Sequence, residues 1–101
     1  MSAADSKGVV TIGHKFRGYC EHCEGEVEGE MITGVENIQI EGKDICTTDS
    51  IGQGYCGHTC KAIGKSEVFF IEGLPVVREG DPVTDGIEGV LIEGSDFVFS
   101  Q

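Results

Sequence analysis

The chain has 101 residues, 18 of them acidic and 7 basic, so its formal net charge is −11. Its length predicts one small domain over residues 1–101, and 16 glycines beside 2 prolines favour a turn-rich β fold over a helical one. The few lysines and arginines are scattered, which argues against a phosphate-binding surface, so we expect no nucleic acid partner.

Short strands account for most of the pattern along the chain. Several alternate apolar and polar residues, as Ile38-Gln39-Ile40-Glu41 does, which is typical of a half-buried strand. Many end at a glycine that we interpret as a turn, as in Glu41-Gly42 and Glu72-Gly73. The predicted strands are Gly8–Phe16, Met31–Glu41, Glu67–Glu72, Gly89–Glu93 and Phe97–Phe99.

These strands belong to an internal repeat. Residues 31–42, 63–73 and 91–99 each contain an apolar stretch, a glycine, a short turn and a further strand. Three units of about thirty residues fit the chain, a size usual for structural repeats. The last copy stops just after its strand, and the first is preceded by the unpaired strand Gly8–Phe16. We therefore predict that the N-terminal strand closes the third unit, giving an all-β ring with pseudo-threefold symmetry.

The N-terminal segment Met1–Lys7 is small and polar and lacks the apolar core of a signal peptide. No apolar run reaches the length needed to span a bilayer. We therefore expect synthesis in a cytoplasm, where disulfides are disfavoured. Five cysteines in so short a cytoplasmic chain point first to a metal.

Two similar loops carry cysteine and histidine. Gly18-Tyr19-Cys20-Glu21-His22-Cys23 matches Gly54-Tyr55-Cys56-Gly57-His58-Thr59-Cys60, whereas the third loop, residues 83–86, has neither residue type. Zinc takes four nitrogen or sulfur ligands in a tetrahedron, which two short clusters can supply. The two loops hold six candidate residues, which is more than the four ligands that one zinc ion takes. The preferred metal ligands are Cys20, Cys23, His58 and Cys60, with His22 and Cys56 as further candidates.

Other chemistry stays open for these loops. Iron suits the same ligands, an iron–sulfur or redox centre is a further alternative, and a disulfide between the loops after export is another. Cys46 is interpreted as a small buried apolar residue, His14 as a surface or tip-lining residue, and Asp85 as a solvated turn residue. No nucleophile triad, phosphate loop or carboxylate pair stands out, so we expect no enzymatic activity.

The chain resembles the PAAR-repeat family, most closely over residues 70–81 and 89–98. In that family a strand and turn lead to Pro-Ala-Ala-Arg and Gly-Asp, then to a metal-ligand loop and a Gly-Ser strand. Here Pro75-Val76-Val77-Arg78 stands in the place of Pro-Ala-Ala-Arg, before Gly80-Asp81, and Gly94-Ser95 follows later. The resemblance covers nearly all of Cys20 to Gln101. The first copy departs from it with Lys43-Asp44-Ile45-Cys46-Thr47, and the Cys and His positions depart from the family's usual three His and one Cys around zinc.

The resemblance implies a small β cone with a metal-stabilised tip. Its base would sit on the blunt end of a homotrimeric β-helical spike, at one chain per trimer, in a phage tail baseplate, type VI secretion system or related contractile injection system. It further implies assembly into a virion tail or secreted injection particle, transient contact with a target membrane during puncture, and no small-molecule substrate. Pro75, Arg78, Gly80 and Asp81 would form a structural turn. The alternative function is a small cytoplasmic metal-thiolate protein that binds zinc or iron or transfers electrons.

Overall fold

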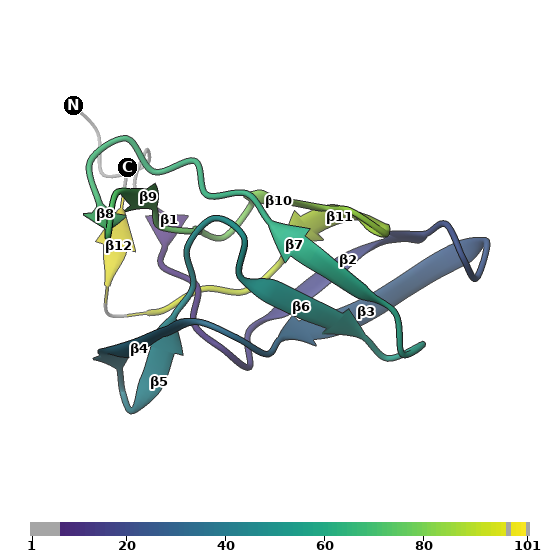
Figure 1. Cartoon of the computed structure of the whole chain (residues 1–101), viewed down its shortest axis with the longest axis horizontal. Coiled ribbons are helices and arrows are strands. Elements are labelled where there is room, and N and C mark those ends of the chain that lie inside the picture. Colours follow the sequence, from purple (N-terminus) through teal and green to yellow (C-terminus); the bar gives the residue numbers. More distant parts are fainter. Residues whose placement is uncertain (1–6, 97, 101) are drawn as a thin grey trace.

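The computed structural model describes residues 7–96 and 98–100. They form an all-β fold with a closed six-stranded barrel at one end and three small two-stranded sheets at the other (Figure 1). None of these residues belongs to a helix long and apolar enough to cross a membrane. The strands are β1 Lys7–Gly8, β2 Lys15–Cys20, β3 Gly25–Met31, β4 Val35–Ile40, β5 Lys43–Ile45, β6 Ile51–Gly54, β7 Thr59–Ala62, β8 Phe70–Ile71, β9 Leu74–Pro75, β10 Pro82–Thr84, β11 Ile87–Leu91 and β12 Phe99–Ser100.

The barrel consists of three antiparallel hairpins, β2–β3, β6–β7 and β10–β11, in the order β10-β11-β2-β3-β6-β7. Pairing of β10 with β7 closes the ring, which leaves the barrel without a free strand edge. Strand β7 alternates exposed and buried residues from Thr59 to Ala62, as a strand with one face toward a core does. The hairpin loops lie together at the end of the barrel away from the small sheets (Figure 1).

The three small sheets form the base of the molecule. They are the hairpins β4–β5 and β8–β9 and the pair β1–β12. The pair joins the two ends of the described chain, with Lys7 opposite Ser100, so the N-terminal strand closes the third unit as the repeat predicted. In the hairpins, Glu41-Gly42 and Glu72-Gly73 both have positive φ at both residues, which is the two-residue turn that suits a twisted hairpin.

A closed ring of three backbone hydrogen bonds marks the pseudo-threefold axis. The N–H of Val10 donates to the carbonyl of Val77 (2.9 Å), that of Val77 to Cys46 (3.0 Å), and that of Cys46 to Val10 (2.9 Å). All three residues are fully buried. One segment from each unit therefore meets at the centre, and the three sequence repeats are also three structural repeats.

The three central segments end in equivalent turns closed by different side chains. The Thr11 N–H donates to His14 Nδ1 (2.9 Å), the Thr47 N–H to Ser50 Oγ (3.0 Å) and the Arg78 N–H to Asp81 Oδ2 (2.8 Å). The last turn is the segment that resembles the PAAR motif. There Gly80 has φ +91°, Pro75 pairs with Phe70, and the Arg78 guanidinium contacts the buried Asp81 carboxylate at 3.1 Å.

The barrel core is filled asymmetrically. Phe16, Gly52 and Val83 each occupy the second position of the first strand in their hairpins. Phe16 is fully buried, and a Cβ on Gly52 would lie only 2.7 Å from its Cε2 atom. Because three large side chains cannot meet at one axis, one phenylalanine fills the space that its glycine counterpart leaves.

Several predicted strand bounds change. The segment predicted as Gly8–Phe16 is divided between β1 and β2, because the turn that ends at His14, with Gly13 at φ +90°, interrupts it. Likewise, Met31–Glu41 is divided between the end of β3 and β4.

The later predicted strands change as well. Glu67–Glu72 shortens to β8, since Ser66 Oγ accepts the N–H of Phe69 and bends the chain before it. Gly89–Glu93 becomes β11, which begins earlier, at Ile87. Phe97–Phe99 overlaps β12 at Phe99, and Phe97 lies outside the described residues.

Candidate metal centre

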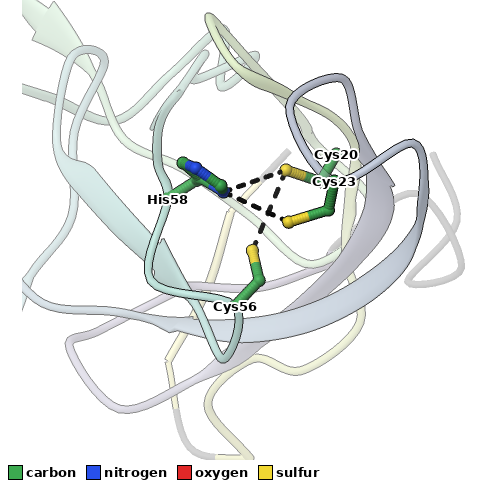
Figure 2. Close-up of side chains that lie close together, drawn as sticks. All are labelled: Cys20, Cys23, Cys56 and His58. Carbon is green, nitrogen blue, oxygen red and sulfur yellow. Dashed lines mark hydrogen bonds between the residues drawn. The ribbon is translucent and has the colours of Figure 1, made fainter.

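Four side chains converge at the loop end of the barrel. Cys20 and Cys23 lie at the β2–β3 loop, and Cys56 and His58 at the β6–β7 loop. The pairing of β3 with β6 makes these two hairpins neighbours. Figure 2 shows the three sulfur atoms and the imidazole pointing toward one another, and one ligand atom from each residue lies within 4.8 Å of all the others. These four residues could hold a metal ion.

Three of the six distances between the ligand atoms are those that one tetrahedral ion requires. His58 Nδ1 lies 3.4 Å from Cys20 Sγ and 3.3 Å from Cys23 Sγ, and the sulfurs of Cys20 and Cys56 are 3.8 Å apart. A tetrahedral zinc with ordinary bond lengths has sulfur–sulfur edges of about 3.8 Å and sulfur–nitrogen edges of about 3.5 Å. The Cys₃His donor set and these three distances are therefore compatible with a tetrahedral metal ion.

Tight turns bring each pair of ligands together. In the first loop, the Glu24 N–H donates to the Cys20 carbonyl (2.8 Å), which folds the Cys-x-x-Cys segment back on itself. In the second, Gly57 separates the two ligands with φ +94°, a conformation that glycine adopts without steric cost. The Gly57 N–H donates to the Gly54 carbonyl (2.9 Å) and closes that turn.

The surroundings of Cys20 and Cys23 shift the pKa values of their thiols in opposite directions. Burial opposes the Cys20 thiolate, but hydrogen bonds from the Cys23 N–H, from the Cys23 and Cys56 thiols and from the His22 N–H outweigh it and lower the pKa of Cys20. The hydrogen bond to Cys20, followed by burial, raises the pKa of Cys23 to about 11. Since a metal binds thiolates, binding would displace these protons.

Cys56 takes the place that the sequence analysis gave to Cys60. Cys60 lies in the core cluster with Phe16 and Met31 and is 1% exposed, and burial raises its pKa to about 11. His58 and Cys60 are two residues apart on one extended segment, so their side chains lie on the same side of it. Cys60, however, lies deeper, in the core of the barrel. A signal for Cys56 was present, because Gly54-Tyr55-Cys56 aligns with Gly18-Tyr19-Cys20.

His22, the other further candidate, is not one of the four converging residues. Its exposed ring stacks on that of His58, with centroids 4.7 Å apart and an interplanar angle of 26°.

The remaining candidates lie elsewhere. Cys46 is on the pseudo-threefold axis, where burial raises its pKa to about 12. His14 is half-buried in its turn near the base. Asp85 is exposed in the third loop and faces Lys61 at 3.9 Å.

The third hairpin places an apolar side chain beside the candidate site. Ile87 begins β11 and is fully buried. It lies opposite Cys20 in the pairing of β11 with β2, and both side chains belong to one core cluster. Two hairpins thus carry the four candidate ligands, and the third packs an apolar residue beside one of them.

No protein-family model matches this chain, and comparison with characterised proteins finds no significant match. The fold and the geometry of the cysteine and histidine cluster therefore carry the functional proposal.

Proposed function

We propose that this protein is a spike tip of the kind that the PAAR-repeat family supplies, capping a homotrimeric β-helical spike of a contractile injection machine. The observation that carries the proposal is the hydrogen-bonded ring of Val10, Cys46 and Val77, which makes one chain pseudo-threefold. A cap on a threefold trimer must offer a similar surface to each protomer. Three structural repeats in a single chain meet that requirement, and they favour a stoichiometry of one chain to three.

The base offers apolar side chains at two of its three equivalent positions. Phe70 in β8 lies opposite Pro75 and is 52% exposed, and Phe99 in β12 lies opposite Gly8 and is 55% exposed. The third equivalent position holds Gln39, which donates to Asp44 at 2.9 Å. In the proposed complex the spike would cover these two rings, and the small sheets also offer strand edges for pairing.

At the other end, the proposed metal is a structural zinc. Zinc has no redox chemistry and takes closed Cys₃His sites in small folds. Binding at structural sites contributes about 10–16 kcal/mol in zinc peptides at neutral pH. The loops that hold Cys20, Cys23, Cys56 and His58 are short and mostly exposed, so a metal would stabilise a point with little core of its own.

The proposed tip is made in the cytoplasm and assembled into a virion tail or a secreted injection particle. It touches the target membrane transiently as the spike crosses it. The proposal includes neither an enzymatic activity nor a small-molecule substrate.

The alternative function is a metal-thiolate protein that carries iron and transfers electrons. The exposure of Cys23 and Cys56 favours it, because an iron held there would lie near solvent and near a redox partner. It gives no role to the threefold base, however. Iron-thiolate centres absorb visible light and zinc centres do not, so the absorption spectrum of the purified protein separates the two.

The experiment that tests the spike-tip proposal is the mass of the complex formed with the trimeric spike protein of the same gene cluster. We expect one chain per trimer. A complex with three chains per trimer, or no complex at all, would contradict the proposal.

A further inference from the structure

His22 links the two loops of the candidate metal centre. It belongs to the same loop as Cys20 and Cys23, and its ring stacks on His58 of the neighbouring hairpin at a centroid distance of 4.7 Å. The stack therefore links the loop that carries Cys20 and Cys23 to a ligand of the other loop.

The stack matters because His58 has little else to fix its ring. Its Nδ1 faces the sulfurs of Cys20 and Cys23. A histidine bound to a metal usually donates its other ring N–H to a carboxylate or a carbonyl, and that bond holds the ring in the ligating orientation. Within residues 7–96 and 98–100 no hydrogen bond reaches the Nε2 atom of His58. The stacking contact with His22 is therefore the interaction that remains to orient the His58 ring.

We propose that His22 is a positioning residue for the metal centre: by stacking on His58 it holds that ligand toward the three sulfurs and slows loss of the ion. This inference rests on the metal site of the proposed function. An exposed ring over a half-buried one also covers one face of the ligand against water and competing chelators. A preorganised ligand loses less freedom when the ion binds, so both affinity and residence time increase.

The test compares zinc loss from the purified full chain and three variants. Zinc transfer to the chromophoric chelator 4-(2-pyridylazo)resorcinol gives the rate, and competition gives the affinity. We expect His22→Ala to weaken zinc binding by about tenfold, at the lower end of the effect of groups that orient metal ligands. His22→Phe keeps a stacking ring without a ligand atom and should stay close to wild type. Glu21→Ala, an exposed neighbour in the same loop, is the matched control and should change nothing.

Cobalt supplies a second readout. The absorption spectrum of the Co²⁺-loaded protein reports the ligand set, and it should be the same for wild type, His22→Ala and His22→Phe. Equal zinc loss from wild type and His22→Ala would overturn the proposal. So would equal weakening in the Ala and Phe variants with an altered cobalt spectrum, since His22 would then be a ligand.

A wild-type chain that binds no zinc would overturn this inference together with the metal site. The spike-tip proposal would not be affected by that result, because the mass of the complex with the spike tests it separately. A wild-type chain that binds zinc, with no effect of His22→Ala, would remove only the role of His22.

Discussion

Cys56 and Cys60 share one hairpin but have opposite surroundings. Cys56 is exposed and its thiol lies 3.8 Å from Cys20 Sγ, whereas Cys60 is buried among core side chains. A buried thiol with a raised pKa is inert, while a thiol beside other ligands is available to a metal. The two cysteines should therefore respond to substitution in different ways.

We expect Cys56→Ser to reduce the bound metal below one ion per chain and to lower the melting temperature. Each kcal/mol of lost binding free energy should lower Tm by about 4–8 °C in a domain of this size. Cys60→Ala should keep one metal per chain and cost about 1 kcal/mol through a small cavity. Elemental analysis with thermal unfolding checks both. Full metal content in Cys56→Ser and loss of metal in Cys60→Ala would restore Cys60 as the ligand.

His14 makes the stability of the fold depend on pH. Its Nδ1 accepts the Thr11 N–H and must therefore be unprotonated. Burial lowers its pKa from 6.5, against the opposing effect of Glu93. The unfolded chain then binds more protons than the folded one in the range from about pH 6.5 down to the lowered value, so stability is present above this range and falls as the pH falls through it.

The measurement is the free energy of unfolding of wild type and His14→Ser at several pH values, with metal in excess. Serine is the natural group in the equivalent turn, where Ser50 accepts the Thr47 N–H. We expect the difference between the two proteins to be constant above pH 7 and to shift in favour of the variant below pH 6.5. A difference that does not vary with pH would rule out this role for His14.

Much of the candidate site could be predicted from the sequence. Cys20, Cys23 and His58 follow from the spacing of two matching loops, because short spacing limits how far the side chains can separate. Loop matching aligns Cys56 with Cys20 and so favours Cys56, but closeness to His58 in sequence does not separate it from Cys60. The depth of Cys60 in the barrel shows that it packs in the core.

At the scale of the elements, three different sequences form the same turn. The three central turns are closed by His14, Ser50 and Asp81, and one of them resembles the family motif. Each side chain only needs an acceptor atom for the N–H three residues earlier. The first repeat therefore keeps the same structure without the Pro-to-Arg segment.

Strand bounds were less predictable for a related reason. The alternation in Gly8–Phe16 continues on both sides of the turn, so the apolar pattern alone does not show the break at Gly13. The closure of the third unit was predictable, because the repeat leaves one strand without a partner at each end of the chain.

The barrel core gives a prediction at this scale. Gly52→Ala should destabilise the fold by about 1–3 kcal/mol, because the added Cβ meets the Phe16 ring. In a Phe16→Leu background the smaller side chain should relieve most of that penalty. The measurement is a double-mutant cycle by denaturant unfolding, with an expected coupling of about 0.5–3 kcal/mol.

Gly89→Ala is the control for this cycle. A Cβ at Gly89 meets the backbone carbonyl of Arg17 and not the phenylalanine. Its penalty should be the same in both backgrounds. If Phe16→Leu relieved Gly89→Ala as much as Gly52→Ala, the specific packing of Phe16 against Gly52 would be refuted.

At the scale of the whole molecule, the two ends differ in kind. One end carries three pseudo-equivalent sheets with exposed Phe70 and Phe99, and the other carries the Cys and His cluster. The net charge of −11 makes separate copies repel one another. These features together support a cap with a base and a point.

The mass of the complex with the trimeric spike tests this account most directly, measured for wild type and two matched variants. Phe70 lies on the base and Val90, 45% exposed, on the barrel; both substitutions place a glutamate on the surface. We predict one chain per trimer for wild type and Val90→Glu, and no complex for Phe70→Glu with its melting temperature unchanged. Binding that survives Phe70→Glu but is lost in Val90→Glu, or a wild-type chain that does not bind, would contradict the account.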